Sequence, residues 1–173
     1  LWKLGRVSGG AISEDGLQVA YAVRSYDLEK NSGTSEIHLL TLDGQRDRVI
    51  GKPWKSISDL QWGHGTSAGR LFFVGIPADI KDAKAQIWSV NPKKAKPRQV
   101  TDVEAGVANL KVAPTGTHFA FTVDVKMDAT VNELYSDLPK ADARIIDSLL
   151  FRHWNAWHDY AYSHLHVARF SNG

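Results

Sequence analysis

Few residues in this sequence could do chemistry, and one pentapeptide stands out first. Gly65-Thr66-Ser67-Ala68-Gly69 matches the G-x-S-x-G pattern, in which a sharp turn between a strand and a helix exposes a serine nucleophile. Apolar, strand-like segments at 60–62 and 71–74 lie on both sides, so we expect strand–turn–strand instead. Asp159 and His164 follow in the order of a Ser–Asp–His triad, but chain order alone is easily satisfied. We therefore predict a structural turn and no catalytic residue in this chain.

Histidines form a second candidate cluster. His153, His158, His164 and His166 are four of the seven histidines and lie within fourteen residues. Neutral imidazole is a good zinc or nickel ligand, and positions 164 and 166 share one face of a strand. Their spacing matches no zinc signature, and the absence of cysteine removes thiolate sites. We expect no metal and no cofactor; a metal site with Asp159 as a further ligand is the alternative.

The candidate substrate-binding residues are Arg152, His153, Trp154 and Trp157. A guanidinium group can hold a peptide backbone by charge-assisted hydrogen bonds, while indole rings stack on a side chain. A structural role is the other interpretation, in which the tryptophans fill space between sheets and the arginine pairs with a carboxylate. Two nearby acids, Asp147 and Asp159, could hold a free peptide N-terminus, and the sequence does not rank them.

Composition limits the remaining functions. The 173 residues carry 21 Lys and Arg against 19 Asp and Glu, a near-balance that gives no basis for nucleic-acid or membrane binding. The basic run at 93–98 is typical of a solvated turn. No apolar run approaches the roughly 18–20 residues of a membrane span. We expect neither nucleic acid nor a membrane as a partner.

The elements that position these residues recur with a period of 50 residues. Ile12, Trp62 and Val112 each precede a polar, glycine-containing turn and then an aromatic or apolar strand. The turns are 13–16, 63–69 and 113–116, and the strands after them are 19–23, 71–74 and 119–123. Segments 37–40 and 87–90 are also 50 residues apart. Several matches in one register make chance recurrence a poor explanation.

Four short strands in a period of roughly 40–50 residues are typical of a β-propeller blade. Blades stack face to face, so their middle strands are covered on both sides and have continuous apolar runs. A peripheral strand tolerates charges such as those at 46–48. We predict an all-β fold, a partial β-propeller of about two and three-quarter four-stranded blades. The predicted blades are 1–51, 52–103 and, incomplete, 104–173.

The third period is longer than the first two. Its third strand, 163–167, arrives about 28 residues later than the first period predicts. Within the extra residues Asp137 can cap a helix, Pro139 can occupy its first turn, and apolar residues recur at helical spacing. We predict one short helical insertion over about 137–151. Long insertions between repeats tend to lie on one face, which is often the functional one.

Several segments together resemble a known family. They are 4–8, Ser13-Glu14-Asp15-Gly16, Tyr26-Asp27 with Asn31-x-Gly33, and 147–157 with its Arg-His-Trp-x-x-Trp motif. They resemble the N-terminal propeller of bacterial prolyl oligopeptidase-family (S9) serine peptidases, in particular the dipeptidyl peptidase 5 and acylaminoacyl-peptidase-like branch. The likeness covers nearly the whole chain. Ser13-Glu14-Asp15-Gly16 stands where such proteins usually have Ser-Pro-Asp-Gly, a turn common to many propellers, whereas the Arg-His-Trp-x-x-Trp motif is more specific.

The resemblance implies a seven- or eight-bladed propeller that caps a C-terminal α/β-hydrolase domain and restricts access to short peptides. The hydrolase domain and its triad are absent from these 173 residues, so the parent protein is expected to be a peptidase and this chain alone is not. The implied partners are a short peptide and the protein's own hydrolase domain. The implied location is the periplasm, with the cytoplasm as the alternative.

A non-enzymatic propeller is the second hypothesis, a binding scaffold of the periplasmic translocation-associated kind. It shares the Ser-Pro-Asp-Gly turns, but it has no need of the insertion or of the motif at 152–157. The chain begins without Met and ends on Asn172-Gly173, a hairpin signal, so we expect a piece of a longer protein. The open blade edges of a partial propeller are expected to allow self-association.

Overall fold

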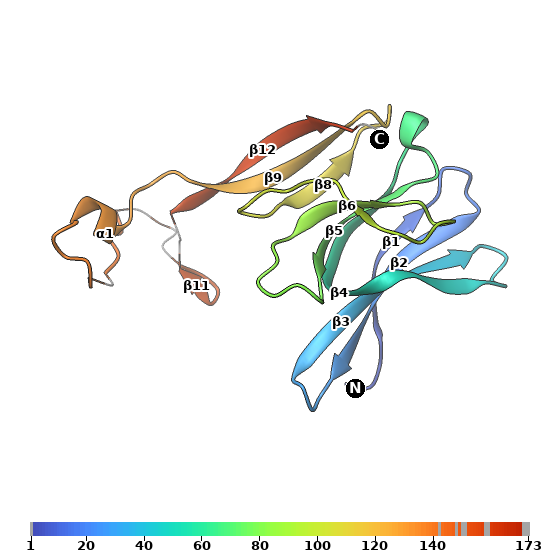
Figure 1. Cartoon of the computed structure of the whole chain (residues 1–173), viewed down its shortest axis with the longest axis horizontal. Helices are drawn as coiled ribbons and strands as arrows, with labels where there is room; N and C mark the ends of the chain where they lie inside the picture. Colours follow the sequence, from blue (N-terminus) through green and yellow to red (C-terminus); the bar gives the residue numbers. More distant parts are fainter. Residues whose placement is uncertain (1, 142, 148, 150–151, 158–159, 171–173) are drawn as a thin grey trace.

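The computed structural model describes residues 2–141, 143–147, 149, 152–157 and 160–170. Within these ranges most of the chain forms antiparallel strands in two main sheets, with a small ribbon in the insertion (Figure 1). The all-β class predicted from the sequence is confirmed. Over the same ranges no helix has the length and apolar character that crossing a membrane requires.

In the described residues the first sheet has the order β1-β2-β3-β4-β5-β6-β7, and each strand pairs with the next one in the chain. Its strands are β1 Arg6–Ile12, β2 Gln18–Asp27, β3 Ser32–Thr41, β4 Asp47–Trp62, β5 Leu71–Pro77, β6 Gln86–Val90 and β7 Arg98–Gln99. The second sheet has the order β12-β9-β8. Its strands are β8 Ala108–Val112, β9 His118–Lys126 and β12 Ala161–Arg169.

Strand β4 belongs to two blades at once. Its first half pairs with β3 and its second half with β5, and Trp54 lies opposite Ser35 on one side and Pro77 on the other. One continuous strand therefore leaves the outer position of one blade and enters the inner position of the next. The predicted boundary at 51 and 52 falls inside β4, and the one at 103 and 104 falls in the loop before β8. The blade boundaries themselves stay predictions.

The three inner strands, β1, the second half of β4, and β8, share one irregularity at a spacing of 50 residues. Each has a β-bulge, where Gly9, Asp59 and Asn109 have φ of 63°, 51° and 57°. A bulged residue with positive φ bends the strand and redirects its side chains. The repeat found in the sequence is therefore also a repeat of backbone conformation.

Side chains connect each inner strand to the next inner strand. The Trp62 indole donates a hydrogen bond to the Ala11 carbonyl at 3.0 Å, between β4 and β1. The Gln61 side chain accepts one from the Val112 amide at 3.1 Å, between β4 and β8. Both contacts join residues 51 positions apart. Neighbouring blades are thus held in register by the same spacing that their sequences repeat.

Two hydrophobic clusters fill the spaces between the blades. The first contains Ala20, Ala22, Ile37, Leu39, Ile50, Trp54, Leu60, Trp62, Leu71, Phe73 and Val90. The second contains Phe72, Val74, Ile87, Val107, Leu110, Phe119, Phe121, Val123 and Phe170. Adjacent residues of β5 enter opposite clusters, which explains why this strand is a continuous apolar run. The aromatic side chains that recur at equivalent positions of the repeats are expected to form the core, and Trp62, Phe72, Phe73, Phe119 and Phe121 are buried there, with Trp88 half-buried against the first cluster.

The insertion between β9 and β12 corrects the sequence prediction. Its described helix is a single turn, α1 at Val131–Leu134, whereas the described residues of 137–151 lie in turns and irregular structure. The helix predicted over about 137–151 is therefore wrong in position. The actual start is a capping box, in which Thr130 and Glu133 bond each other's backbone amides.

The reason for the difference is a lack of packing. Ile145, Ile146 and Leu149 recur at helical spacing, but they are 44%, 47% and 85% exposed. A short helix that buries no apolar face is marginal in water, so spacing alone does not form one. Leu150, Phe151 and two other predicted insertion residues lie outside the described part of the chain. In Figure 1 the insertion extends to the left, away from the two sheets.

Candidate functional site

The G-x-S-x-G segment forms a 3-10 turn, Gly65–Ser67, between β4 and β5. Ser67 is 1% exposed, and its hydroxyl donates a hydrogen bond to the His64 carbonyl at 3.1 Å. A Cβ atom on Gly116 would lie 2.6 Å from the Ser67 hydroxyl oxygen, so the turn is packed closely against the equivalent turn of the next blade. A buried, bonded serine presents no nucleophile. The strand–turn–strand context predicted from the sequence is present.

Three of the four candidate histidines lie in the described part of the chain, on two different strands: His153 on β10, and His164 and His166 on β12. The His166 ring stacks on Phe121 with ring centroids 5.6 Å apart. His158 and Asp159 lie outside the described residues. Among the residues that are described, no group of three or more His, Asp or Glu side chains could hold a metal ion.

The four candidate binding residues lie on or beside a two-stranded ribbon in the insertion. Its strands are β10, Arg152–His153, and β11, Ala156–Trp157. Arg152 pairs with Trp157 in the ribbon, and its guanidinium carbon lies 5.3 Å from the centroid of the indole ring. A second guanidinium, that of Arg144, lies 5.9 Å from the same ring. Trp157 is therefore a cation–π partner of two arginines.

Trp154 occupies the turn of this ribbon and is the most accessible member of the set. Its side chain is 90% exposed and its φ is 55°. Bulky residues rarely adopt positive φ, so the turn holds Trp154 in an uncommon backbone conformation. The structure thus brings Arg152 and Trp157 together and points Trp154 outward. His153 is exposed on β10. Asp147, which precedes the ribbon in the sequence, is also exposed.

A second cluster of cations and rings was missed by the sequence analysis. The Arg6 guanidinium lies 5.2 Å from the Trp2 ring centroid and 4.9 Å from that of Tyr26. The Arg24 guanidinium carbon lies 5.4 Å from the centroid of the Tyr26 ring. The Trp2 and Tyr26 rings meet edge to face. The register of β1 and β2 places Arg6 opposite Arg24, and only that register brings these residues together. Pairing segment 6–12 with segment 18–27 would have found them, but the strand predicted after the first turn ends at 23.

This cluster borders a groove of about 650 Å³ at the β2–β3 end of the sheet. The residues that line it are Trp2, Arg24, Tyr26, Asp27, Leu28, Asn31, Ser32, Gly33, Thr34, Lys55 and Ala78. Arg24 is held in place by donating a hydrogen bond to the Lys55 carbonyl at 2.8 Å. Gly33 leaves room for it, since a Cβ atom there would lie 3.0 Å from the guanidinium.

The groove carries charges of both signs. Hydrogen bonds from the Lys30 amide and ammonium group hold the pKa of Asp27 below its usual value, so this carboxylate is charged at neutral pH. Arg24 and Lys55 supply positive charge on the groove wall. The arrangement offers a guanidinium, an aromatic face and a carboxylate. These groups can bind the backbone and charges of a short peptide, but they do not include a nucleophile.

The groove and the ribbon lie at the same rim of the blades. The β2–β3 turn and the β9–β12 insertion connect equivalent strands of the first and the third repeat, and equivalent connections fall on one face of a repeat array. In Figure 1 the β2–β3 turn lies at the bottom and the insertion at the left, while the 3-10 turn lies at the upper right. The chemically capable groups are therefore at the opposite rim from Ser67.

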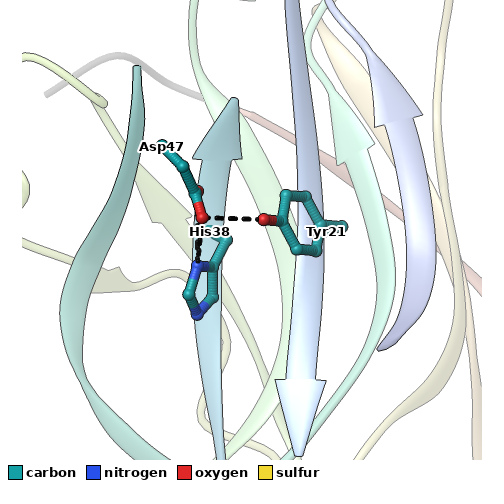
Figure 2. A network of polar contacts seen from close by, with 3 residues as sticks. All are labelled: Tyr21, His38 and Asp47. Carbon is teal, nitrogen blue, oxygen red and sulfur yellow. Dashed lines mark hydrogen bonds and ion pairs between the residues drawn. The ribbon is translucent and has the colours of Figure 1, made fainter. Parts of the chain in front are cut away.

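A third polar cluster crosses β2, β3 and β4 (Figure 2). The Tyr21 hydroxyl donates a hydrogen bond to Asp47 Oδ2 at 3.0 Å, and His38 Nδ1 lies 3.2 Å from the same oxygen. The rings of Tyr21 and His38 stack with centroids 5.2 Å apart. Burial and the hydrogen bond to Asp47 raise the pKa of Tyr21, which keeps its hydroxyl protonated at neutral pH. These polar contacts connect three neighbouring strands, and none of the three side chains is an activated nucleophile.

Comparison with protein-family models finds no match. Two curated relatives are each named dipeptidyl-peptidase 5. The one from Porphyromonas endodontalis is 23% identical over 157 residues, which are 91% of this chain and 22% of the relative. The one from Porphyromonas gingivalis is 29% identical over 154 residues, 89% of this chain and 22% of the relative. This chain spans about a fifth of the length of the curated relatives it matches.

Solved structures show the fold. Pyrococcus horikoshii acylaminoacyl peptidase aligns with a TM-score of 0.69 and 14% identity, over 96% of this chain and 23% of its own. The β-propeller domain of the Trilobed protease from Pyrococcus furiosus aligns with a TM-score of 0.52 and 14% identity, over 69% and 34%. TolB from Acinetobacter baumannii aligns with a TM-score of 0.50 and 16% identity, over 69% and 27%. The partial β-propeller predicted from the 50-residue period is confirmed.

Sequence and fold point to the same group of proteins. The sequence matches dipeptidyl-peptidase 5 over about nine tenths of this chain, and the fold matches acylaminoacyl peptidase over 96% of it. The resemblance predicted from the sequence is thereby confirmed: relatives named dipeptidyl-peptidase 5 match most of this chain, and its partial β-propeller is similar in fold to acylaminoacyl peptidase and to the propeller domain of the Trilobed protease.

Proposed function

We propose that this chain is the propeller portion of a serine exopeptidase of the dipeptidyl or acylaminoacyl type. In this proposal it gates and positions short peptides for a C-terminal α/β-hydrolase domain, which carries out the hydrolysis. The observation that carries the proposal is the grouping of guanidinium and indole side chains at one rim of the blades, on the β10–β11 ribbon.

The ribbon gives each residue a role in the proposal. Trp154, which is 90% exposed, packs against a side chain of the bound peptide. Arg152 donates to a peptide carbonyl or carboxylate, and its cation–π contact with Trp157 fixes the direction of the guanidinium. His153 is adjacent on β10 and supplies a further donor. None of these groups breaks a bond, so their effect is on peptide affinity.

A non-enzymatic scaffold similar to TolB is the second candidate, because TolB shares the propeller fold. The extent of the alignments favours the peptidase. Acylaminoacyl peptidase aligns over 96% of this chain, whereas TolB aligns over 69%. The longer alignment supports the peptidase over the scaffold.

The test is hydrolysis by the complete polypeptide that contains this chain. Dipeptidyl and N-acyl-aminoacyl p-nitroanilides are the substrates, and the 173-residue chain alone is the control, which we expect to be inactive. Trp154→Ala is expected to raise KM several-fold with kcat unchanged, because the side chain contributes binding and no chemistry. Leu17→Ala is the matched control, since Leu17 is 64% exposed at the opposite rim. Absence of hydrolysis overturns the peptidase; an unchanged KM overturns the role of Trp154.

Two further parts of the proposal concern the protein in its cell and in solution. A periplasmic location, with the cytoplasm as the alternative, is tested by fractionating cells and probing for the complete protein. Association of this chain with a second copy through open blade edges is tested by light scattering, which is expected to show species larger than 19.2 kDa. A monodisperse monomer at high concentration contradicts that association.

A further inference from the structure

A groove at the outer edge of the first two blades is not used by the proposed function. It has a volume of about 650 Å³ and lies between the middle of β4, the end of β5 and the turn that follows β6. Its lining is rich in proline and tryptophan: Val49, Gly51, Lys52, Pro53, Trp54, Pro77, Asp79, Ile80, Trp88, Ala95, Lys96 and Pro97.

The bend in β4 creates this groove. Residues 51–53 bulge out between two pairs of β3 and β4, Ile37 with Ile50 and Ser35 with Trp54. Gly51 has a φ of 78°, and a Cβ atom on it would lie 3.0 Å from the Pro97 ring, so glycine is required for both the bend and the contact. Pro53 lacks an amide donor and cannot close the ladder there. The two blades consequently separate at their edge.

One indole in the groove wall has no hydrogen-bond partner. Trp54 is 4% exposed, and its Nε1 is a buried donor without an acceptor among the described residues. By contrast, the indoles of Trp62 and Trp88 donate to the carbonyls of Ala11 and Gly75. An unpaired buried donor is unfavourable, and each one in a folded protein calls for an explanation.

The position of the Trp54 ring indicates where its donor lies. Its Cε3 edge lies against β5, 2.9 Å from where a Cβ atom on Gly75 would be. Nε1 is on the opposite edge of an indole, away from that packed contact. Because Trp54 lines the groove, we infer that the buried donor is on the groove side of the ring.

Charged side chains also line this groove. Lys52 Nζ lies 2.9 Å from Asp79 Oδ2, and this hydrogen bond holds the pKa of Asp79 below its usual value. Lys96 also lines the groove, so the lining has two ammonium groups for one carboxylate. The excess charge is positive and favours a ligand that carries a carboxylate.

We propose that this groove binds an extended, proline-containing peptide segment next to a carboxylate. Polyproline II peptides make no internal hydrogen bonds, so their carbonyls are free to accept one from the Trp54 indole. Aromatic-lined grooves are the usual partners of such segments. Proline rings pack on Trp88 and on the exposed side chains of Val49 and Ile80, and the carboxylate pairs with Lys96. The site is separate from the β10–β11 ribbon.

Titration of the full chain with Ac-Pro-Pro-Glu-Pro-amide, followed by calorimetry, tests the proposal. Ac-Gly-Gly-Glu-Gly-amide is the control peptide and is expected to bind at least tenfold more weakly. Trp54→Phe keeps the ring but removes the donor, and it is expected to weaken binding about five- to tenfold, the effect of one hydrogen bond. Trp62→Phe removes a donor outside the groove and is expected to leave the affinity unchanged.

Two lysine variants test the role of the positive charge in the groove. Lys96→Ala is expected to weaken binding several-fold, whereas Lys94→Ala, in the same turn but outside the groove, is expected to have no effect. Equal binding of the two peptides overturns the proposal, and so does an unchanged affinity in a folded Trp54→Phe chain. If that variant fails to fold, Ile80→Ser and Lys96→Ala decide, since both positions are exposed. These experiments measure peptide affinity and not peptidase activity. A negative result would therefore overturn the groove proposal without bearing on the proposed function.

Discussion

The stacked strands and the insertion are held together by different forces. In the strands, side chains such as Phe73 are fully buried between blades, and contacts recur at a fixed offset of 51 residues. In the insertion, apolar side chains are largely exposed, and the single helical turn rests on a capping box and the Lys126–Glu133 ion pair. Burial therefore determines the blades, whereas local polar contacts determine the insertion.

The largest expected difference comes from truncating one apolar side chain in each region. Phe73→Ala is expected to lower the free energy of unfolding by about 3–5 kcal/mol, because it leaves a cavity beside Trp54. Ile146→Ala, at a position 47% exposed in the insertion, is expected to change it by less than about 0.5 kcal/mol. Urea unfolding of the two variants measures both. Similar losses would contradict the contrast between the regions.

The next effect concerns the polar contacts between blades. Gln61 bonds the backbone of both Leu110 and Val112, so Gln61→Leu leaves two backbone groups unpaired. A loss of about 1–3 kcal/mol is expected from each buried group left without a partner. Gln45→Leu, in an exposed turn, is the matched control and should be neutral. If the two variants melt alike, this contact does not hold the blades in register.

A smaller effect is expected at the cluster of Tyr21, His38 and Asp47 on β2, β3 and β4. Tyr21→Phe removes the hydrogen bond to Asp47 and is expected to cost about 0.5–1.5 kcal/mol. Because the folded state raises the pKa of Tyr21, its contribution is complete below the ordinary value of 10.0 and is lost as pH rises through the raised pKa. Thermal melts from pH 8 to 11 should therefore converge for the two proteins at the alkaline end.

The smallest global effect is expected in the insertion. Hydrogen bonds from Lys126 and from the Thr130 amide lower the pKa of Glu133 from 4.5 to about 2. A lowered pKa means that the contribution is present above 4.5 and is lost as pH falls toward 2. Amide exchange at 133–135 should accelerate over that window, and Glu133→Gln should accelerate it at neutral pH. Slow exchange in that variant would show that packing, not the cap, holds α1.

The blades could be predicted because burial leaves a periodic record in sequence. The anchors at Ile12, Trp62 and Val112 gave the strand order, and the flanking strands gave the nature of the Ser67 turn. The continuity of β4 could not be predicted, since Gly51 and Pro53 are ordinary signs of a break. The structure tolerates them by a bulge.

The position of the helix and the groove at the β2–β3 end depended on tertiary contacts. Spacing favoured a helix at 137–151, yet Ile145, Ile146 and Leu149, which are described there, are exposed, and the capping box at Thr130 begins the helical turn that forms. Arg6 is 18 residues before Arg24 in the sequence and meets Arg24 and Tyr26 through the register of β1 and β2. Charge and aromatic content alone therefore did not reveal this cluster.

The shared strand β4 also bears on how the molecule comes apart. Because one continuous strand serves blades on both sides of Trp54, neither blade can lose it without disrupting its neighbour. Among the described strands, the third group shares none with the second: the second hydrophobic cluster, the Gln61 hydrogen bonds and the loop after β7 connect them. The first two blades are thus expected to unfold as one cooperative unit, whereas the third can separate from them by losing side-chain contacts alone, without breaking a shared strand.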